Sequence, residues 1–96
     1  MKRLQVGKLY KTSELYKFAE VAFIIYSVPH MDSRYSYGTV TYDETIFILE
    51  DNSSFQDEDN IPTYTPVKIL DASGSVGYIY LASWDRNSLI LIEPKI

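Results

Sequence analysis

The sequence lacks cysteine entirely, and it has a single histidine among its 96 residues. Without cysteine the chain can form neither a disulfide framework nor a thiolate metal site, and it has no cysteine nucleophile. His30 alone cannot build a histidine-based metal cluster, and no Gly-x-Ser-x-Gly motif for an activated serine occurs anywhere. We therefore expect a protein that is not an enzyme and that holds no metal and no cofactor.

Long hydrophobic runs are also missing. No run approaches the roughly 20 apolar residues that a membrane-spanning helix needs, and residues 1–17 contain no apolar core of a signal peptide. We expect a cytoplasmic protein without a membrane partner. The 46% apolar and 15% aromatic composition is sufficient for the core of one domain over residues 1–96.

Charge is unevenly spread along the chain, whose net charge is −4. Residues 1–17 carry five basic side chains and one acidic side chain, whereas seven acidic residues lie between Asp43 and Asp59. The acidic part disfavours nucleic acid and favours a basic protein partner, or serves solubility alone. Binding of single-stranded nucleic acid by the basic segment, with Tyr10 and Tyr16 as stacking rings, remains the alternative.

Alternation of apolar and polar residues, with β-branched and aromatic enrichment, predicts a mainly β protein. The expected strands cover residues 4–11, 21–28, 39–50, 66–70, 77–82 and 89–92. The strand at 39–50 is either one long strand or two short strands that bend at Asp43-Glu44. One short N-terminal helix is expected at about 13–20, where apolar residues recur every three or four positions. Residues 30–38, 50–64 and 83–87 are expected as loops or turns.

The segment from residue 67 onward resembles the small SH3-like β-barrel. Its residues are Val67-Lys68-Ile69-Leu70, then Gly74-Ser75-Val76-Gly77-Tyr78-Ile79, then Trp84 and a last strand from Leu89 to Ile92. The resemblance implies a distal hairpin, a short 3₁₀ turn and a closing strand in an antiparallel barrel. Tyr80 stands where peptide-binding SH3 domains have proline, so the resemblance does not extend to binding of Pro-rich peptides. An OB-like barrel, also five-stranded, is the other barrel compatible with this pattern.

Nine tyrosines are the most unusual feature of the composition. Tyrosine, tryptophan and arginine are enriched at the energetically dominant positions of protein interfaces, and several of them cluster in residues 34–42 and 84–86. These rings could equally pad the flanks of a small barrel. The candidate partner-binding residues are Arg34, Tyr35, Tyr37, Tyr42, Trp84 and Arg86.

These observations favour a non-catalytic module that binds another protein. Its size and composition also resemble those of small accessory proteins of bacteriophages, which implies a role in binding or inhibiting a host protein in the host cytoplasm. Self-association into a homo-oligomeric structural protein is the third hypothesis, because exposed tyrosines serve self-contacts as well as foreign ones.

Overall fold

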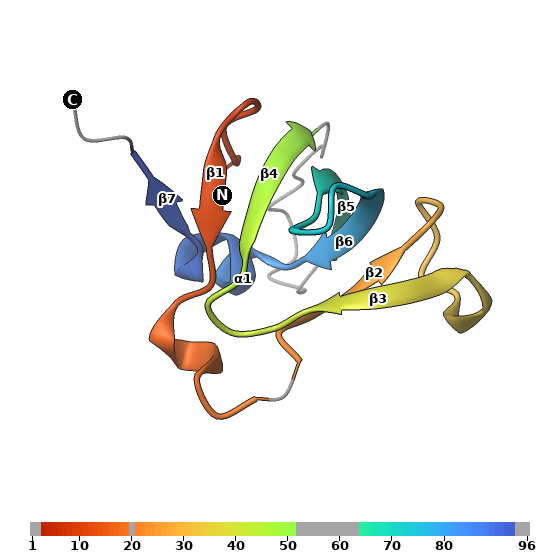
Figure 1. The fold of residues 1–96 in the computed structure, drawn as a ribbon, viewed down its shortest axis with the longest axis horizontal. Coiled ribbons are helices and arrows are strands. Elements are labelled where there is room, and N and C mark those ends of the chain that lie inside the picture. Colours follow the sequence, from red (N-terminus) through yellow and green to blue (C-terminus); the bar gives the residue numbers. More distant parts are fainter. Residues whose placement is uncertain (1–2, 20, 52–63, 94–96) are drawn as a thin grey trace, which may run out of the picture.

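The computed structural model describes residues 3–19, 21–51 and 64–93. The described chain is mainly β, as the residue pattern predicts, and its strands form one antiparallel sheet (Figure 1). The strands are β1 (Leu9–Lys11), β2 (Phe23–Tyr26), β3 (Ser36–Val40), β4 (Thr45–Glu50), β5 (Thr65–Leu70), β6 (Val76–Leu81) and β7 (Ile90–Ile92). Three short helical segments accompany them: η1 (Glu14–Tyr16), η2 (Ser33–Tyr35) and α1 (Ser83–Ser88).

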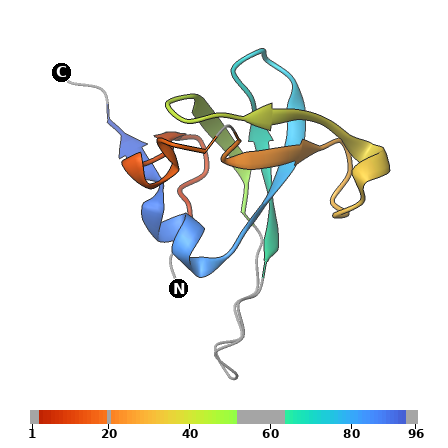
Figure 2. The ribbon, with the colours of Figure 1, turned by 90° about the horizontal axis from the view of Figure 1, so that it is seen from below.

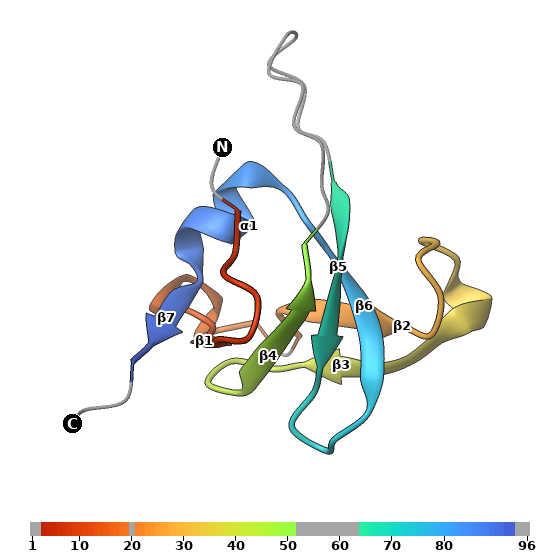
Figure 3. The ribbon, with the colours of Figure 1, turned by 90° about the horizontal axis from the view of Figure 1, so that it is seen from above.

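The strand order across the sheet is β3-β2-β6-β5-β4-β1-β7. The end strands of this order, β3 and β7, do not pair with each other in the described residues, so the sheet is open. Strong curvature brings distant strands together: the β2–β3 hairpin runs across the direction of β4 and β5 (Figure 3). The predicted hairpin of residues 66–82 forms as β5 and β6, paired from Thr65↔Leu81 to Leu70↔Val76.

The core lies on one face of the curved sheet. Buried and less buried residues alternate along β4, β5 and β6, as expected when one face of a strand packs inward. The last strand of the chain, β7, lies at the edge of the sheet, and Ile90 is exposed. The core consists of Leu4, Tyr10, Phe23, Ile25, Val40, Ile46, Ile48, Val67, Ile69, Ile79, Leu81 and Leu89.

The N-terminal helix expected at 13–20 shrinks to the 3₁₀ turn η1. Its backbone bonds run from Tyr16 N to Ser13 O and from Lys17 N to Glu14 O, the three-residue spacing of a 3₁₀ helix. Phe18, which the periodicity assigned to a buried helical face, is 94% exposed. Tyr16 points inward instead, with its ring 5.3 Å from that of Phe23, so the segment is anchored by one aromatic residue rather than by a helical stripe.

The opposite correction applies to residues 83–87, expected as a turn and observed as the short helix α1. Arg86 N and Leu89 N donate to Ala82 O and Asp85 O at helical spacing. The Asp85 carboxylate reaches back to accept a hydrogen bond of 2.9 Å from Ala82 N, which satisfies one amide at the start of the helix. The helix is too short to show a helical periodicity in the sequence. This local cap explains why it forms nevertheless.

Residues 30–50 form two strands and a 3₁₀ turn. The strand β3 begins at Ser36, inside the stretch 30–38 expected as a loop, and η2 precedes it. The two-strand interpretation of 39–50 is confirmed, since the corner between β3 and β4 contains Asp43 with φ of 73°. The long acidic loop expected at 50–64 falls mainly on residues 52–63, which lie outside the described residues.

Gly77 is required by close packing rather than by a turn. A Cβ at this position would overlap the Tyr37 hydroxyl and the Ile25 side chain, which lie against the β6 backbone. Glycine here lets the β2–β3 hairpin pack onto β6. Gly38, by contrast, would place a Cβ 3.9 Å from Ile25 Cδ1, an ordinary van der Waals distance.

We predict that Gly77→Ala lowers the free energy of unfolding by about 1–3 kcal/mol, the typical cost of overpacking a core site. Gly38→Ala, on β3, is the matched control and should change the free energy of unfolding by less. Urea denaturation followed by tryptophan fluorescence measures both. Equal effects of the two substitutions would contradict this account of Gly77.

Candidate functional site

A groove of about 370 Å³ opens beside β2, and Asp85 of α1 forms part of its lining. Apolar and aromatic side chains make up most of its lining, and several of them are far more exposed than core residues: Ile24 is 47% exposed, Met31 60% and Tyr64 47%. Exposed apolar surface gathered in a hollow is typical of a binding site. The groove is lined by Val21, Ala22, Phe23, Ile24, Tyr26, Met31, Tyr64, Tyr80 and Asp85.

The lining residues come from segments far apart in the sequence. Ile24 points outward from β2 because its neighbours Phe23 and Ile25 point into the core. Tyr64 precedes β5, and its neighbour Thr65 is buried. Tyr80 lies on β6, where its ring meets Tyr26 edge-on at 5.7 Å, and burial together with the neighbouring Tyr26 raises the pKa of Tyr80.

Trp84 stands beside this groove. Its ring lies 5.9 Å from that of Tyr64 in a T-shaped arrangement, and half of the Trp84 residue is exposed. The T-shaped pair is a rigid aromatic surface, since each ring limits the movement of the other. Of the six residues expected to bind a partner, Trp84 is the one that the structure places next to the groove.

Asp85 is the one charged residue among the described residues of the lining, and it is buried, with 7% of its surface exposed. Its Oδ1 accepts a hydrogen bond of 2.6 Å from the Tyr16 hydroxyl, and its Oδ2 accepts from Ala82 N. Ser88 Oγ also lies 3.2 Å from the Tyr16 hydroxyl. Burial and the bond to the anionic Asp85 raise the pKa of Tyr16 to about 12, because both disfavour the phenolate.

Arg86, expected on the binding surface, lies in the core instead. Its side chain is completely buried and forms an ion pair with Asp51, and its Nη2 donates to Thr65 Oγ1 at 2.6 Å. Asp51 also accepts a hydrogen bond of 2.9 Å from Leu4 N. A fully buried guanidinium cannot touch a partner, so Arg86 serves the fold.

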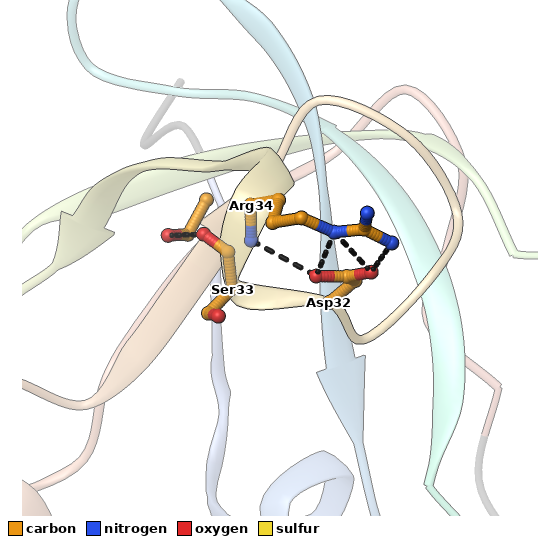
Figure 4. A network of polar contacts seen from close by, with 4 residues as sticks. Asp32, Ser33 and Arg34 are labelled. Carbon is orange, nitrogen blue, oxygen red and sulfur yellow. Dashed lines mark hydrogen bonds and ion pairs between the residues drawn. The ribbon is translucent and has the colours of Figure 1, made fainter.

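The tyrosine-rich loop, residues 30–42, is held in place by contacts among its own residues. Asp32 caps η2 by accepting from Arg34 N at 3.0 Å, and the Arg34 guanidinium donates to both oxygens of the same carboxylate (Figure 4). These bonds hold the pKa of Asp32 below its usual value and raise that of Arg34. The Arg34 guanidinium also lies 5.7 Å from the centre of the Tyr35 ring. Arg34 and Tyr35 are exposed, but neither lines the groove.

Tyr37 and Tyr42 lie outside the groove lining, and Tyr37 is 45% exposed. The Tyr37 hydroxyl lies 3.2 Å from Val76 O and 3.4 Å from Asp71 Oδ2, and burial, with the nearby Asp71 charge, raises its pKa. Its ring covers Gly77. Tyr42 is half-buried in the corner before β4. Of residues 30–42, Met31 is the one that lines the groove, and Tyr64 and Trp84 come from elsewhere in the chain.

The nucleic-acid alternative keeps its charges but loses a stacking ring. Tyr10 is completely buried, and its hydroxyl accepts a hydrogen bond of 2.9 Å from Gln5 N. Tyr16 faces Asp85. A base could not stack on Tyr10 without rearrangement of the fold, whereas a single-strand site needs exposed aromatic faces.

Sequence reasoning missed Ile24, Met31 and Tyr64 because single apolar residues at exposed strand and loop positions look the same as core residues. Position 24 carried a weak signal, since strict alternation along β2 places it opposite the buried Phe23 and Ile25. β2 and α1 are far apart in sequence, yet residues of both line the same groove. Figure 2 gives a second view of the two elements, β2 in orange and α1 in blue.

No protein-family model, curated protein or solved structure matches this chain. Within the described ranges, no helix is long and apolar enough to cross a membrane. The same ranges contain no group of three or more histidine, aspartate or glutamate side chains placed to hold a metal ion.

We predict that Arg86→Met destabilises the protein by about 3–5 kcal/mol, because it removes the guanidinium from a buried carboxylate. The matched double variant Asp51→Asn with Arg86→Met should recover part of this loss, since it leaves no buried charge at the pair. Thermal and urea unfolding measure both. A loss below about 1 kcal/mol in Arg86→Met, the typical value of a surface pair, would contradict the buried role.

A second prediction concerns Tyr16. Its folded pKa of about 12 exceeds the ordinary value of 10, so its contribution to stability is complete below pH 10. That contribution is lost as the pH rises from 10 to 12, because the unfolded chain then ionises first. The stability advantage of the wild type over Tyr16→Phe should therefore shrink between about pH 9 and about pH 11. Urea denaturation at both pH values tests this, and a constant difference would contradict it.

Proposed function

We propose that this protein is a non-catalytic binding module that holds an extended, largely apolar segment of another protein in the groove beside β2. The observation that carries the proposal is the gathering of exposed Ile24, Met31, Tyr64 and Trp84 around one hollow. Burying such side chains against a partner is favourable, at about 25 cal/mol per Å² of apolar surface removed from water.

The character of the rings supports recognition of a protein. Tyrosine and tryptophan have few rotatable bonds, so they lose little conformational entropy on binding while contributing a large contact area. The edge-on pairs Tyr64–Trp84 and Tyr26–Tyr80 hold four rings at or beside the groove in fixed relative orientations. A preorganised surface of this kind binds more tightly than a mobile one of the same area.

The order of elements supports the finer proposal of an SH3-like architecture. The chain runs from β1 through the β2–β3 hairpin to the meander β4–β5–β6, then through α1 to β7, which returns to pair with β1. The β5–β6 hairpin and the pairing of β7 with β1 support this proposal, whereas the short α-helix α1 stands where the resemblance implies a 3₁₀ turn. Tyr80 lines the groove at the position where peptide-binding SH3 domains have proline, so the proposed ligand is not a Pro-rich segment.

Peptides selected from a random displayed library on the full immobilised chain provide the test. We predict that Tyr64→Ala and Trp84→Ala each weaken binding of selected peptides by about tenfold or more, the loss typical of an aromatic hot spot. Fluorescence anisotropy measures the affinity. Both residues are about half exposed, so the variants should unfold with unchanged cooperativity.

Tyr35→Ala is the control, because Tyr35 is 42% exposed but lies outside the groove lining. Its affinity for the same peptides should stay at the wild-type level. Weakening by Tyr35→Ala alone would move the binding surface to the tyrosine-rich loop and refute the groove. Sedimentation velocity on the wild-type chain separates this result from self-association.

A further inference from the structure

The groove is apolar and aromatic except at one point. Asp85 contributes a carboxylate to its lining, and no lysine or arginine lines it within the described residues. The adjacent cation on α1, Arg86, is turned into the core toward Asp51 and Thr65. The electrostatic character of the groove is therefore set by one anion among aromatic rings.

This carboxylate retains capacity for another donor. A carboxylate offers about four acceptor positions, and the described donors are the Tyr16 hydroxyl and Ala82 N. Asp85 keeps 7% of its surface exposed, and a ligand that covers the groove would remove this remaining part from solvent. A neutral apolar ligand would leave that loss uncompensated, whereas a cation would replace the water with a charge-assisted interaction.

The surrounding aromatic rings also favour a positively charged group on the ligand. Phe23, Tyr26, Tyr64 and Tyr80 line the same hollow as Asp85. The faces of aromatic rings attract cations, more strongly where water is excluded. The net charge of −4 adds a long-range attraction for basic ligands and opposes acidic ones.

We propose that the segment bound in this groove carries a lysine or arginine among apolar residues, and that its cationic group meets Asp85 and the aromatic lining. This inference rests on the proposed function, and it names the chemistry that the groove selects. Asp85 would thus be a specificity residue, while Tyr64 and Trp84 supply apolar contact.

The experiment uses the random displayed library on the full chain. The selected peptides should share a lysine or arginine at one position, flanked by apolar residues. In anisotropy titrations, replacing that residue with glutamine should weaken binding by about tenfold or more, the factor expected for a charge-assisted bond to a shielded carboxylate. The Asp85→Asn protein should lose most of this preference for the basic peptide over its glutamine variant.

Asp43→Asn is the matched control, because it removes the same charge at an exposed corner outside the groove lining. Asparagine also tolerates the positive φ of 73° at that corner. The preference for the basic peptide should stay at the wild-type value in this variant. Equal losses in Asp43→Asn and Asp85→Asn would show a general charge effect and overturn the assignment to Asp85.

The outcomes separate the two proposals. Peptides that depend on Tyr64 and Trp84 but share no basic residue, or whose preference survives Asp85→Asn, overturn this inference and leave the proposed function intact. Failure to select any peptide sensitive to Trp84→Ala refutes the proposed function itself. Should Asp85→Asn not unfold cooperatively, Tyr64→Leu replaces it: the preference for lysine over norleucine should fall because the ring face is lost, and an unchanged preference overturns the inference.

Discussion

The buried ion pair between Arg86 and Asp51 is the constraint on which the rest of the structure depends. It joins α1 to the end of β4, and through Thr65 Oγ1 it also reaches the start of β5. Asp51 in turn accepts from Leu4 N, which adds the N-terminal segment. Burying two charges is expensive unless their geometry is well satisfied, so this pair tolerates few alternative arrangements of the four segments. Its role is to fix their relative positions more than to add stability.

The groove follows from that constraint. Trp84, Asp85 and Arg86 are consecutive in α1, so one helical turn sends them in three directions: into solvent, toward the groove and into the core. Tyr64 and Thr65 are likewise neighbours, one exposed and the other bonded to Arg86. Anchoring Arg86 to Thr65 therefore also sets the distance between the rings of Trp84 and Tyr64. The buried polar pair in this way positions the exposed aromatic pair.

The sequence was sufficient for the local part of this architecture. The β5–β6 hairpin and the mainly β class follow from short-range alternation and the glycine-containing turn, because both are decided by neighbouring residues. The burial of Arg86 was not accessible, since its partner Asp51 lies 35 positions away and an arginine beside tryptophan looks like a surface residue. The same limit applies to Tyr64 and Met31, which line one groove although they are far apart in the sequence.

Some of the tyrosines serve the fold and others remain exposed, and this difference indicates where the site lies. Tyr10 fills the core and Tyr16 supports Asp85, so these two rings are committed to the fold, whereas Tyr37 covers Gly77 but remains 45% exposed outside the groove lining. Tyr64 makes an aromatic contact but keeps nearly half of its surface exposed. A ring that is oriented yet uncovered has already lost most of the freedom that binding would cost, and its apolar face is still in contact with water. That combination, next to a shielded carboxylate, distinguishes the groove from the other tyrosine-bearing surfaces of the molecule.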